Sequence, residues 1–206
     1  MDSFDFHFKY PTIIQVFGPT RYGKTRLVQI IHVNHLIQPF ASKIIWVYSE
    51  WQPDYDMICE RYPGIEFDKG WRDEIFDSLS PEQRTILVLD NQMGEANSIK
   101  SVADLFTKGS HHRNLTVIYL VQNLYNHGKR QRTISLSSHY SVVFCNGRDA
   151  SQFHTITYQI CPNNGKWLVD SFTDATSKPY GYLILEHNPL TPEDQTVVTN
   201  ILPGES

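Results

Sequence analysis

The sequence predicts one α/β domain, spanning residues 1–206, with a mainly parallel β-sheet flanked by helices on both faces. Hydrophobic residues make up 40% of the chain and charged residues 19%, a composition typical of globular domains. Continuous apolar runs rich in β-branched residues recur, and segments of helical length separate them. Because strands inside a parallel sheet are buried on both faces, runs without polar alternation favour that kind of sheet.

The apolar runs and the segments between them predict the elements in order. The expected strands are Thr12–Phe17, Lys43–Tyr48, Thr85–Leu89, Leu115–Val121, Ser141–Cys145 and, as the last, Tyr182–Leu185. The expected helices are Lys24–Ile37, Asp54–Tyr62, Trp71–Leu79 and Ser98–Gly109. Apolar residues recur at spacings of three and four in the first helix, and proline or glycine follows or ends most of these segments.

The ends of the chain and its cysteines exclude several classes of protein. The first ten residues are polar and acidic without an apolar core, and the longest apolar runs are too short to span a bilayer. We therefore expect a protein that is not secreted, has no transmembrane segment and does not bind a membrane. Three cysteines without a C-x-x-C pair argue against a disulfide scaffold. From about Asn188, three prolines predict a loosely packed extension of the domain.

Residues Gly18–Thr25 match the Walker A pattern G-x-x-x-x-G-K-[ST], directly after a predicted strand and at the start of a predicted helix. Glycines let backbone N–H groups face phosphates, and the helix directs its N-terminus at the anion. Lys24 is expected to reach the β and γ phosphates, and the Thr25 hydroxyl to hold Mg²⁺. The loop between is Pro19, Thr20, Arg21, Tyr22 and Gly23, in which Arg21 either adds a phosphate contact or is solvated. ATP and Mg²⁺ are therefore the expected cofactors.

Polar residues follow two later strands at the edge where the P-loop is expected. Asp90 comes directly after Thr85–Leu89 and is the candidate Walker B carboxylate for the Mg²⁺ hydration shell. The alternative is an ordinary aspartate that caps the next helix. Gln122 and Asn123 follow Leu115–Val121, where an amide would sense the γ-phosphate or orient water. A polar strand-end cap is the alternative there.

The net charge of −4 conceals an uneven distribution. From Leu105 to Arg148 there is no Asp or Glu, and six basic residues give this basic tract a charge of +6, which leaves −10 for the rest. The six are Lys108, Arg113, Lys129, Arg130, Arg132 and Arg148. Such a tract indicates either contact with a polyanion through one face or pairing with an acidic neighbouring subunit.

Several segments, taken in order, resemble a known family. They are the P-loop, Leu89-Asp90, Leu105–Asn114 (LFTKGSHHRN), Gln122-Asn123, Ser138–Tyr140 and Asn146–Asp149. Together they resemble the FtsK–HerA-type genome-packaging ATPases of adintoviruses and Polinton/Maverick elements and, more distantly, those of poxviruses and adenovirus-like lineages. The resemblance runs from about Phe8 to Pro203.

The resemblance implies an ASCE (RecA-like) P-loop fold and an ATPase that moves double-stranded DNA, without sequence specificity, into a preformed capsid. It implies a homo-oligomeric ring, partners at the capsid portal or vertex, and a location in the virion or infected host cell. Such rings complete each site with an arginine of the next subunit. Arg113 is the first candidate for that finger, with Arg132 and Arg148 as rivals.

The chain departs from the family pattern at Asn91, where a second carboxylate usually polarises the attacking water. An amide orients water but is a poor base. Glu95 is the expected substitute, and Glu50 is another candidate. If neither acts, hydrolysis is slow or lost. Two other functions stay open. One is a non-hydrolysing nucleotide-dependent assembly protein, which Asn91 suggests, and the other is a small-molecule P-loop kinase, which the size of the chain allows. Adjacent His111 and His112 do not share a face, so no further metal is expected there.

Overall fold

The structure is a computed structural model that describes residues 6–90, 114–122, 136–144, 153, 157, 165–192 and 195–201. Its strands are β1 Phe8–Lys9, β2 Ile13–Phe17, β3 Ile37–Gln38, β4 Lys43–Tyr48, β5 Ile65–Lys69, β6 Thr85–Asp90, β7 Leu115–Val121, β8 Tyr140–Phe144, β9 Tyr182–Glu186 and β10 Val197–Val198. The helices within those ranges are α1 Lys24–Val33, α2 Pro53–Arg61, α3 Asp73–Asp77 and α7 Gly165–Ala175.

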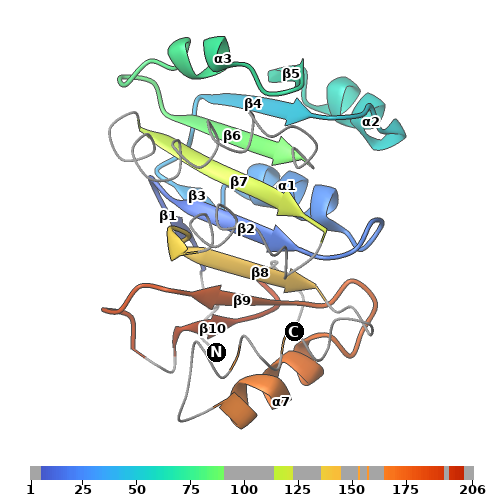
Figure 1. Ribbon diagram of the computed structural model, residues 1–206, viewed down its shortest axis with the longest axis vertical. Helices are drawn as coiled ribbons and strands as arrows, with labels where there is room; N and C mark the ends of the chain where they lie inside the picture. The colour runs from blue at the N-terminus through green and yellow to red at the C-terminus, as the bar shows by residue number, and fades with distance from the viewer. Residues whose placement is uncertain are drawn as a thin grey trace.

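Eight strands form the central sheet in the order β10-β9-β8-β2-β7-β6-β4-β5 (Figure 1). The six strands from β8 to β5 are parallel to their neighbours, whereas β9 pairs antiparallel with β8 and β10 antiparallel with β9. Strand β7 lies between β2, which leads into the P-loop, and β6, which ends at Asp90. The fold is therefore α/β with a mostly parallel sheet, and the inserted β7 is the arrangement expected of the ASCE class.

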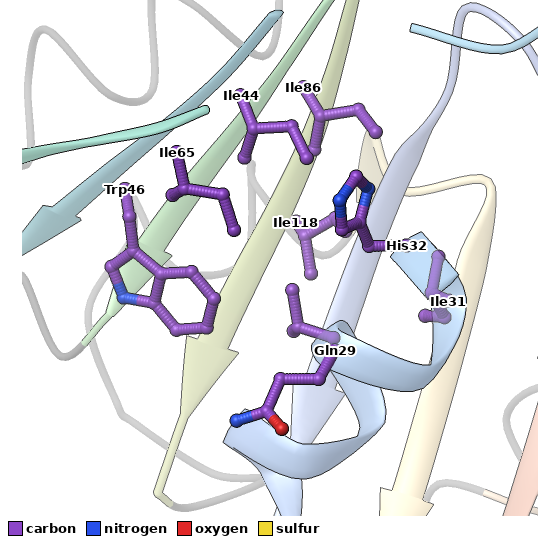
Figure 2. A pocket seen from close by; sticks show the side chains of 9 residues that line it. Gln29, Ile31, His32, Ile44, Trp46, Ile65, Ile86 and Ile118 are labelled. Carbon is purple, nitrogen blue, oxygen red and sulfur yellow. The ribbon is translucent and has the colours of Figure 1, made fainter. Parts of the chain in front are cut away.

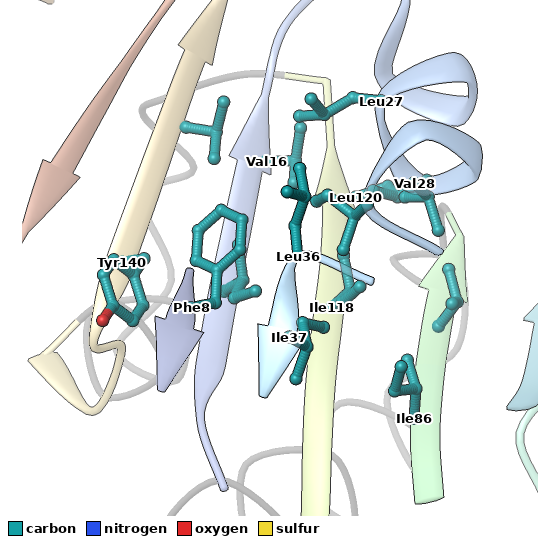
Figure 3. Close-up of a cluster of buried hydrophobic side chains, with 14 of the residues drawn as sticks. Phe8, Val16, Leu27, Val28, Leu36, Ile37, Ile86, Ile118, Leu120 and Tyr140 are labelled. Atoms are coloured by element: carbon teal, nitrogen blue, oxygen red, sulfur yellow. The ribbon is translucent and has the colours of Figure 1, made fainter. Parts of the chain in front are cut away.

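Two apolar clusters lie on opposite faces of the sheet and make three layers. One face carries α1, α2 and the small β1–β3 sheet, with Leu27 and Val28 of α1 against Val16 and Leu120 (Figure 3). The other face carries α3 and α7, whose Ile75, Leu168 and Phe172 join the second cluster. Strands β2, β6, β7 and β8 are buried along their whole length, which explains why their sequences show no polar alternation.

A small gap remains beneath α1 (Figure 2). Its volume is about 10 Å³, at the lower limit for one water molecule. Most of its lining is aliphatic, and it consists of Val28, Gln29, Ile31, His32, Ile44, Trp46, Ile65, Ile86 and Ile118. This is a packing gap and not a site for a ligand.

The first helix is shorter than its sequence predicts. It ends at Val33 instead of Ile37, because the Asn34 side chain donates a hydrogen bond to the Ile30 carbonyl at 3.0 Å and His35 takes a positive φ of 53°. An asparagine and a left-handed residue are a common way to end a helix. Ile37 instead begins β3, which pairs with β1.

Other predicted elements agree with the structure to within a few residues, and some were missed. Strands β1, β3, β5 and β10 and helix α7 were not predicted, and Tyr182–Leu185 is not the last strand. In the region from Asn188, where a loose extension was expected, the described residues 195–201 add β10 and bury Val198 and Ile201. The predicted helix Ser98–Gly109 lies outside the described residues. Among the described helices, none combines the length and apolar character needed to cross a bilayer.

Candidate nucleotide-binding site

The P-loop connects the buried strand β2 to α1 and is held against β7 and β8. The Gly18 N–H donates to the Val121 carbonyl at 3.1 Å. A Cβ on Gly18 would lie 2.9 Å from the Phe144 Cβ, so only glycine fits without a shift. Gly23 takes φ 98°, a left-handed conformation that favours glycine, and begins α1. Packing against Phe144 thus requires glycine at position 18, and the backbone conformation favours glycine at position 23.

The start of α1 is electrostatically suited to an anion. Its first turn contains no acidic residue, so nothing on the helix opposes the partial positive charge of its N-terminus. The Lys24 ammonium donates to the carbonyls of Gly18 and Pro19, at 2.5 and 2.8 Å, and so lies folded over the loop. Burial lowers the pKa of Lys24, and the nearby Asp90 carboxylate opposes that shift.

Asp90 ends β6 close to two buried aromatic residues, Tyr55 and Trp46. The Tyr55 hydroxyl of α2 donates to Asp90 Oδ2 at 2.6 Å, and Tyr55 is completely buried. Burial raises the pKa of Asp90, whereas the Tyr55 hydrogen bond and the Lys24 charge lower it. Burial raises the pKa of Tyr55, and the charge of Asp90 adds to that shift, whereas the neighbouring Trp46 indole acts weakly in the opposite direction on both groups.

A cleft of about 1220 Å³ joins these groups along the carboxyl edge of the parallel strands. From the motif it is lined by Thr20, Arg21, Gly23, Lys24 and Thr25, and from the strand ends by Asp90, Gln122 and Phe144. Its other walls are Arg26, Leu27 and Ile30 of α1, Leu120 of β7, Gln52–Asp54 before and in α2, Asp174–Ala175, Ser177–Tyr182 and Thr199–Asn200. In open α/β sheets, ligands bind at this edge.

The structure thus brings together Lys24, Thr25, Asp90 and Gln122 from three separate segments. Gly18, Pro19 and Tyr22 belong to the same loop without lining the cleft. Glu50 lies apart among the described residues. Its side chain is 86% exposed and faces Lys69, with Nζ and Oε2 3.8 Å apart. Several predicted residues lie outside the described part of the chain, namely Asn91, Glu95, Arg113, Asn123, Arg132 and Arg148.

Two parts of the site were missed by sequence reasoning. Tyr55 lies on a short amphipathic helix, and nothing in its sequence distinguishes a hydrogen-bonding tyrosine from a core one. The turn Lys178–Gly181 has a Pro-x-Gly sequence typical of turns, but only the fold places it opposite the P-loop. The sequence could therefore have predicted the turn, but not its place beside the P-loop.

The residues fit a magnesium nucleotide. The glycine backbone, the helix N-terminus and Lys24 suit phosphates, and a hydroxyl with a carboxylate suits Mg²⁺, which prefers oxygen ligands. The cleft is also large enough for a base and ribose beyond the phosphates, since ligand pockets usually have about 300–1,000 Å³.

Comparison with known proteins finds likenesses among solved structures. No protein-family model matches the chain, and no curated protein does. The genome packaging NTPase B204 of Sulfolobus turreted icosahedral virus 2, in complex with ATP-γ-S, is similar over 91% of this chain and 95% of its own, with TM-score 0.59 and 17% identity. The same protein with sulfate gives TM-score 0.57 and 17% identity over the same shares.

A third structure agrees with these two. The DNA-packaging ATPase B204 of Sulfolobus turreted icosahedral virus is similar over 91% of this chain and 96% of its own, with TM-score 0.55 and 14% identity. At these identities the likeness shows the fold. The chain has the α/β fold of a P-loop NTPase, as its sequence predicts.

Proposed function

We propose that this chain binds Mg-ATP in the cleft and hydrolyses it to drive duplex DNA into a preformed capsid. The observation that carries the proposal is the convergence of Lys24, Thr25 and Asp90 on one cleft, at the edge of a sheet whose order matches the ASCE class. The solved structures with this fold include a DNA-packaging ATPase and a packaging NTPase bound to an ATP analogue, which supports the packaging role.

Each residue of the cleft has a task in that proposal. The backbone of Gly18–Gly23 and the Lys24 ammonium bind the phosphates, and Arg21 lines the same wall. Thr25 and Asp90 would hold Mg²⁺, which would neutralise negative charge on the phosphates. Tyr55 keeps one Asp90 oxygen occupied and thereby fixes the orientation of the carboxylate. Gln122, together with Asn123, senses the γ-phosphate or orients the attacking water.

We further propose that Glu95 orients the attacking water in place of the missing carboxylate at Asn91. The exposed position of Glu50 and its contact with Lys69 weigh against Glu50. Glu95→Gln is expected to lower kcat by about 10²–10⁴-fold, the range for general acid–base catalysis, and to leave ATP binding intact. Glu50→Gln is the matched control and keeps its activity. An inactive Glu50→Gln beside an active Glu95→Gln would reverse the assignment.

We propose a homo-oligomeric ring in which Arg113 reaches the nucleotide of the neighbouring subunit. Arg113→Ala then loses turnover but keeps ATP affinity, because a finger acts in the transition state. Mixing Arg113→Ala with Lys24→Ala subunits restores part of the activity, since some interfaces combine an intact P-loop with an intact arginine. If Arg132→Ala or Arg148→Ala shows this behaviour in its place, that residue is the finger.

The source and partners follow from the resemblance. We propose an adintovirus-like or Polinton-like genome as the origin, a capsid portal or vertex protein as the docking partner, and the virion or infected host cell as the location. The basic tract Leu105–Arg148 would contact DNA phosphates without reading sequence.

ATP turnover measured with and without duplex DNA tests the proposal. A motor hydrolyses Mg-ATP faster when DNA of any sequence is present. Binding without turnover would favour the non-hydrolysing assembly protein that Asn91 suggests. Turnover that needs a small-molecule acceptor and ignores DNA would favour the P-loop kinase. For each of these three functions, Lys24→Ala should abolish the ATP binding or turnover that the wild type shows.

A further inference from the structure

The cleft extends well past the P-loop, to a turn that follows α7. In this turn the Gly181 N–H donates to the Lys178 carbonyl at 3.0 Å, with Pro179 and Tyr180 as the two central residues. Proline fixes a negative φ at the first central position, and Tyr180 has φ 64° at the second. That combination defines a type II turn, whose second central residue is normally glycine or asparagine.

Tyrosine is therefore held in a conformation that suits a much smaller residue. A bulky side chain with positive φ is a genuine outlier and costs free energy, and such outliers cluster at functional sites. Five non-glycine residues in the described part of the chain have positive φ. Three of them, Arg21, Tyr180 and Asn200, line the nucleotide cleft.

The turn packs against α7, which prevents the backbone at Tyr180 from adopting a less strained conformation. A Cβ on Gly181 would lie 2.3 Å from the Ala175 carbonyl oxygen, so the turn packs directly on the end of α7. At that end the Thr176 hydroxyl donates to the Phe172 carbonyl at 2.6 Å, and the Ser177 N–H donates to the Asp174 carbonyl at 3.1 Å. The direction in which the Cα–Cβ bond of Tyr180 leaves the backbone is thus set by the packing of the turn.

That direction brings the ring to the P-loop. The Tyr180 Cδ1 lies 3.4 Å from the position a Cβ on Gly23 would occupy, and Phe144 Cε1 lies 3.5 Å from the same point. Gly23 directly precedes Lys24, so the ring borders the place where phosphates would bind. Tyr180 nevertheless remains 69% exposed, whereas Phe144 beneath is 3% exposed. Tyr180 therefore offers an exposed aromatic side chain on the lining of the cleft, near the buried Phe144.

We propose that Tyr180 is the platform on which the nucleotide base stacks. This inference rests on the proposed nucleotide site and assigns a subsite for the base within it. An aromatic ring offers a flat surface that any base can cover, which predicts tolerance for different bases. The strain at Tyr180 is then retained because glycine or asparagine at the same position would form the turn but leave the base without a stacking partner.

The test compares a ligand with a base and a ligand without one, on the full chain. Calorimetry measures the affinity of Mg-ATPγS and of magnesium tripolyphosphate for the wild type, Tyr180→Gly and Tyr180→Phe. Tyr180→Gly is expected to weaken ATPγS by about 5- to 150-fold, the range for loss of base–aromatic stacking, and to leave tripolyphosphate unchanged. Tyr180→Phe keeps both affinities. The melting temperature of ligand-free Tyr180→Gly equals or exceeds that of the wild type, because glycine relieves the strain.

Two control variants separate the platform from the site as a whole. Trp167→Ala removes another exposed aromatic side chain, on α7 and away from the cleft lining, and should change neither affinity. Lys24→Ala should weaken both ligands, and if it weakens neither, the proposed nucleotide site itself fails. Equal affinity of Tyr180→Gly and wild type for ATPγS overturns the platform. An equal loss of both ligands in Tyr180→Gly also overturns it, since the tyrosine would then support the phosphate loop. A change confined to self-association would make Tyr180 an interface residue.

Discussion

Tyr55 and Asp90 form a hydrogen bond of 2.6 Å in a nearly dry environment, with Tyr55 fully buried and Asp90 5% exposed. Tyr55→Phe removes the donor and leaves a buried carboxylate with one partner fewer. Hydrogen bonds to charged groups contribute about 1.5–3 kcal/mol, so the free energy of unfolding should fall by that amount in urea titration. The magnesium concentration that half-saturates ATPγS binding should rise as well.

Tyr62→Phe is the matched control, because Tyr62 caps the other end of α2 away from Asp90. It should change neither quantity. An unchanged magnesium requirement in Tyr55→Phe would mean that Tyr55 has only a packing role.

His187 predicts how stability depends on pH. Its Nε2 and the Ser141 Oγ are 2.8 Å apart in a hydrogen bond, and burial lowers its pKa below the ordinary 6.5. The unfolded chain therefore binds a proton before the native state does as the pH falls. The contribution of neutral His187 to the free energy of unfolding is therefore fully present above pH 6.5 and is lost as the pH drops below that value. Urea unfolding at pH 7.5 and 5.5 should show lower stability at the acidic pH, and His187→Gln should reduce the difference. An identical difference in the variant would exclude His187 as a source.

Single residues of the site differ in how well the sequence predicts them. Lys24, Thr25 and Asp90 could be predicted because their roles depend on local context, a glycine loop between strand and helix and an acid after a buried strand. Tyr55 could not be predicted, since its role depends on a contact 35 positions away along the chain. Tyr180 could not either, because a strained φ appears only once the turn is built.

At the scale of elements, the central strands contribute more to the stability of the fold than the edge strands. Ile118 lies in the middle of β7 and is 1% exposed. Its side chain belongs to the apolar cluster that α1 covers. Ile118→Ala should lower the free energy of unfolding by about 2–5 kcal/mol, the range for large-to-small changes in a core. Ile65 of the edge strand β5 is only partly buried, so Ile65→Ala should cost clearly less. Equal losses in urea titration would contradict this division between centre and edge.

The sequence predicts the parallel part of the sheet well and its margins poorly. Fully buried strands such as β6 and β7 are continuous apolar runs that leave little choice of structure. The edge strand β5 (IEFDK) has charged residues among its apolar ones, and β10 has only two residues. Their pairing depends on which neighbours the fold brings beside them, and no local pattern carries that information.

At the scale of the whole molecule, charge is divided between regions of the chain. Helices α2 and α3 and strand β5 lie together at one end of the sheet (Figure 1) and carry eight carboxylates, Asp54, Asp56, Glu60, Glu66, Asp68, Asp73, Glu74 and Asp77. The six basic residues of the basic tract lie outside the described residues. The proposed contacts with DNA and with an identical neighbour would use these two regions of opposite charge.

Binding to duplex DNA should therefore depend steeply on salt and little on sequence. The logarithm of the affinity should fall linearly with the logarithm of salt concentration, with a slope of about −0.9 per phosphate neutralised. Fluorescence anisotropy with two unrelated duplexes of equal length measures both properties. Binding that is insensitive to salt, or that strongly prefers one duplex, would contradict a packaging motor.

The central claim is that the cleft beside Lys24 binds Mg-ATP, and ligand-induced stabilisation tests it most directly. Mg-ATPγS at about 100 times its Kd should raise the free energy of unfolding of the wild type by about 2.7 kcal/mol. Lys24→Ala, which removes the ammonium proposed to bind the phosphates, should show no such increase under the same conditions. A full increase in Lys24→Ala, or none in the wild type at any accessible concentration, would contradict the account.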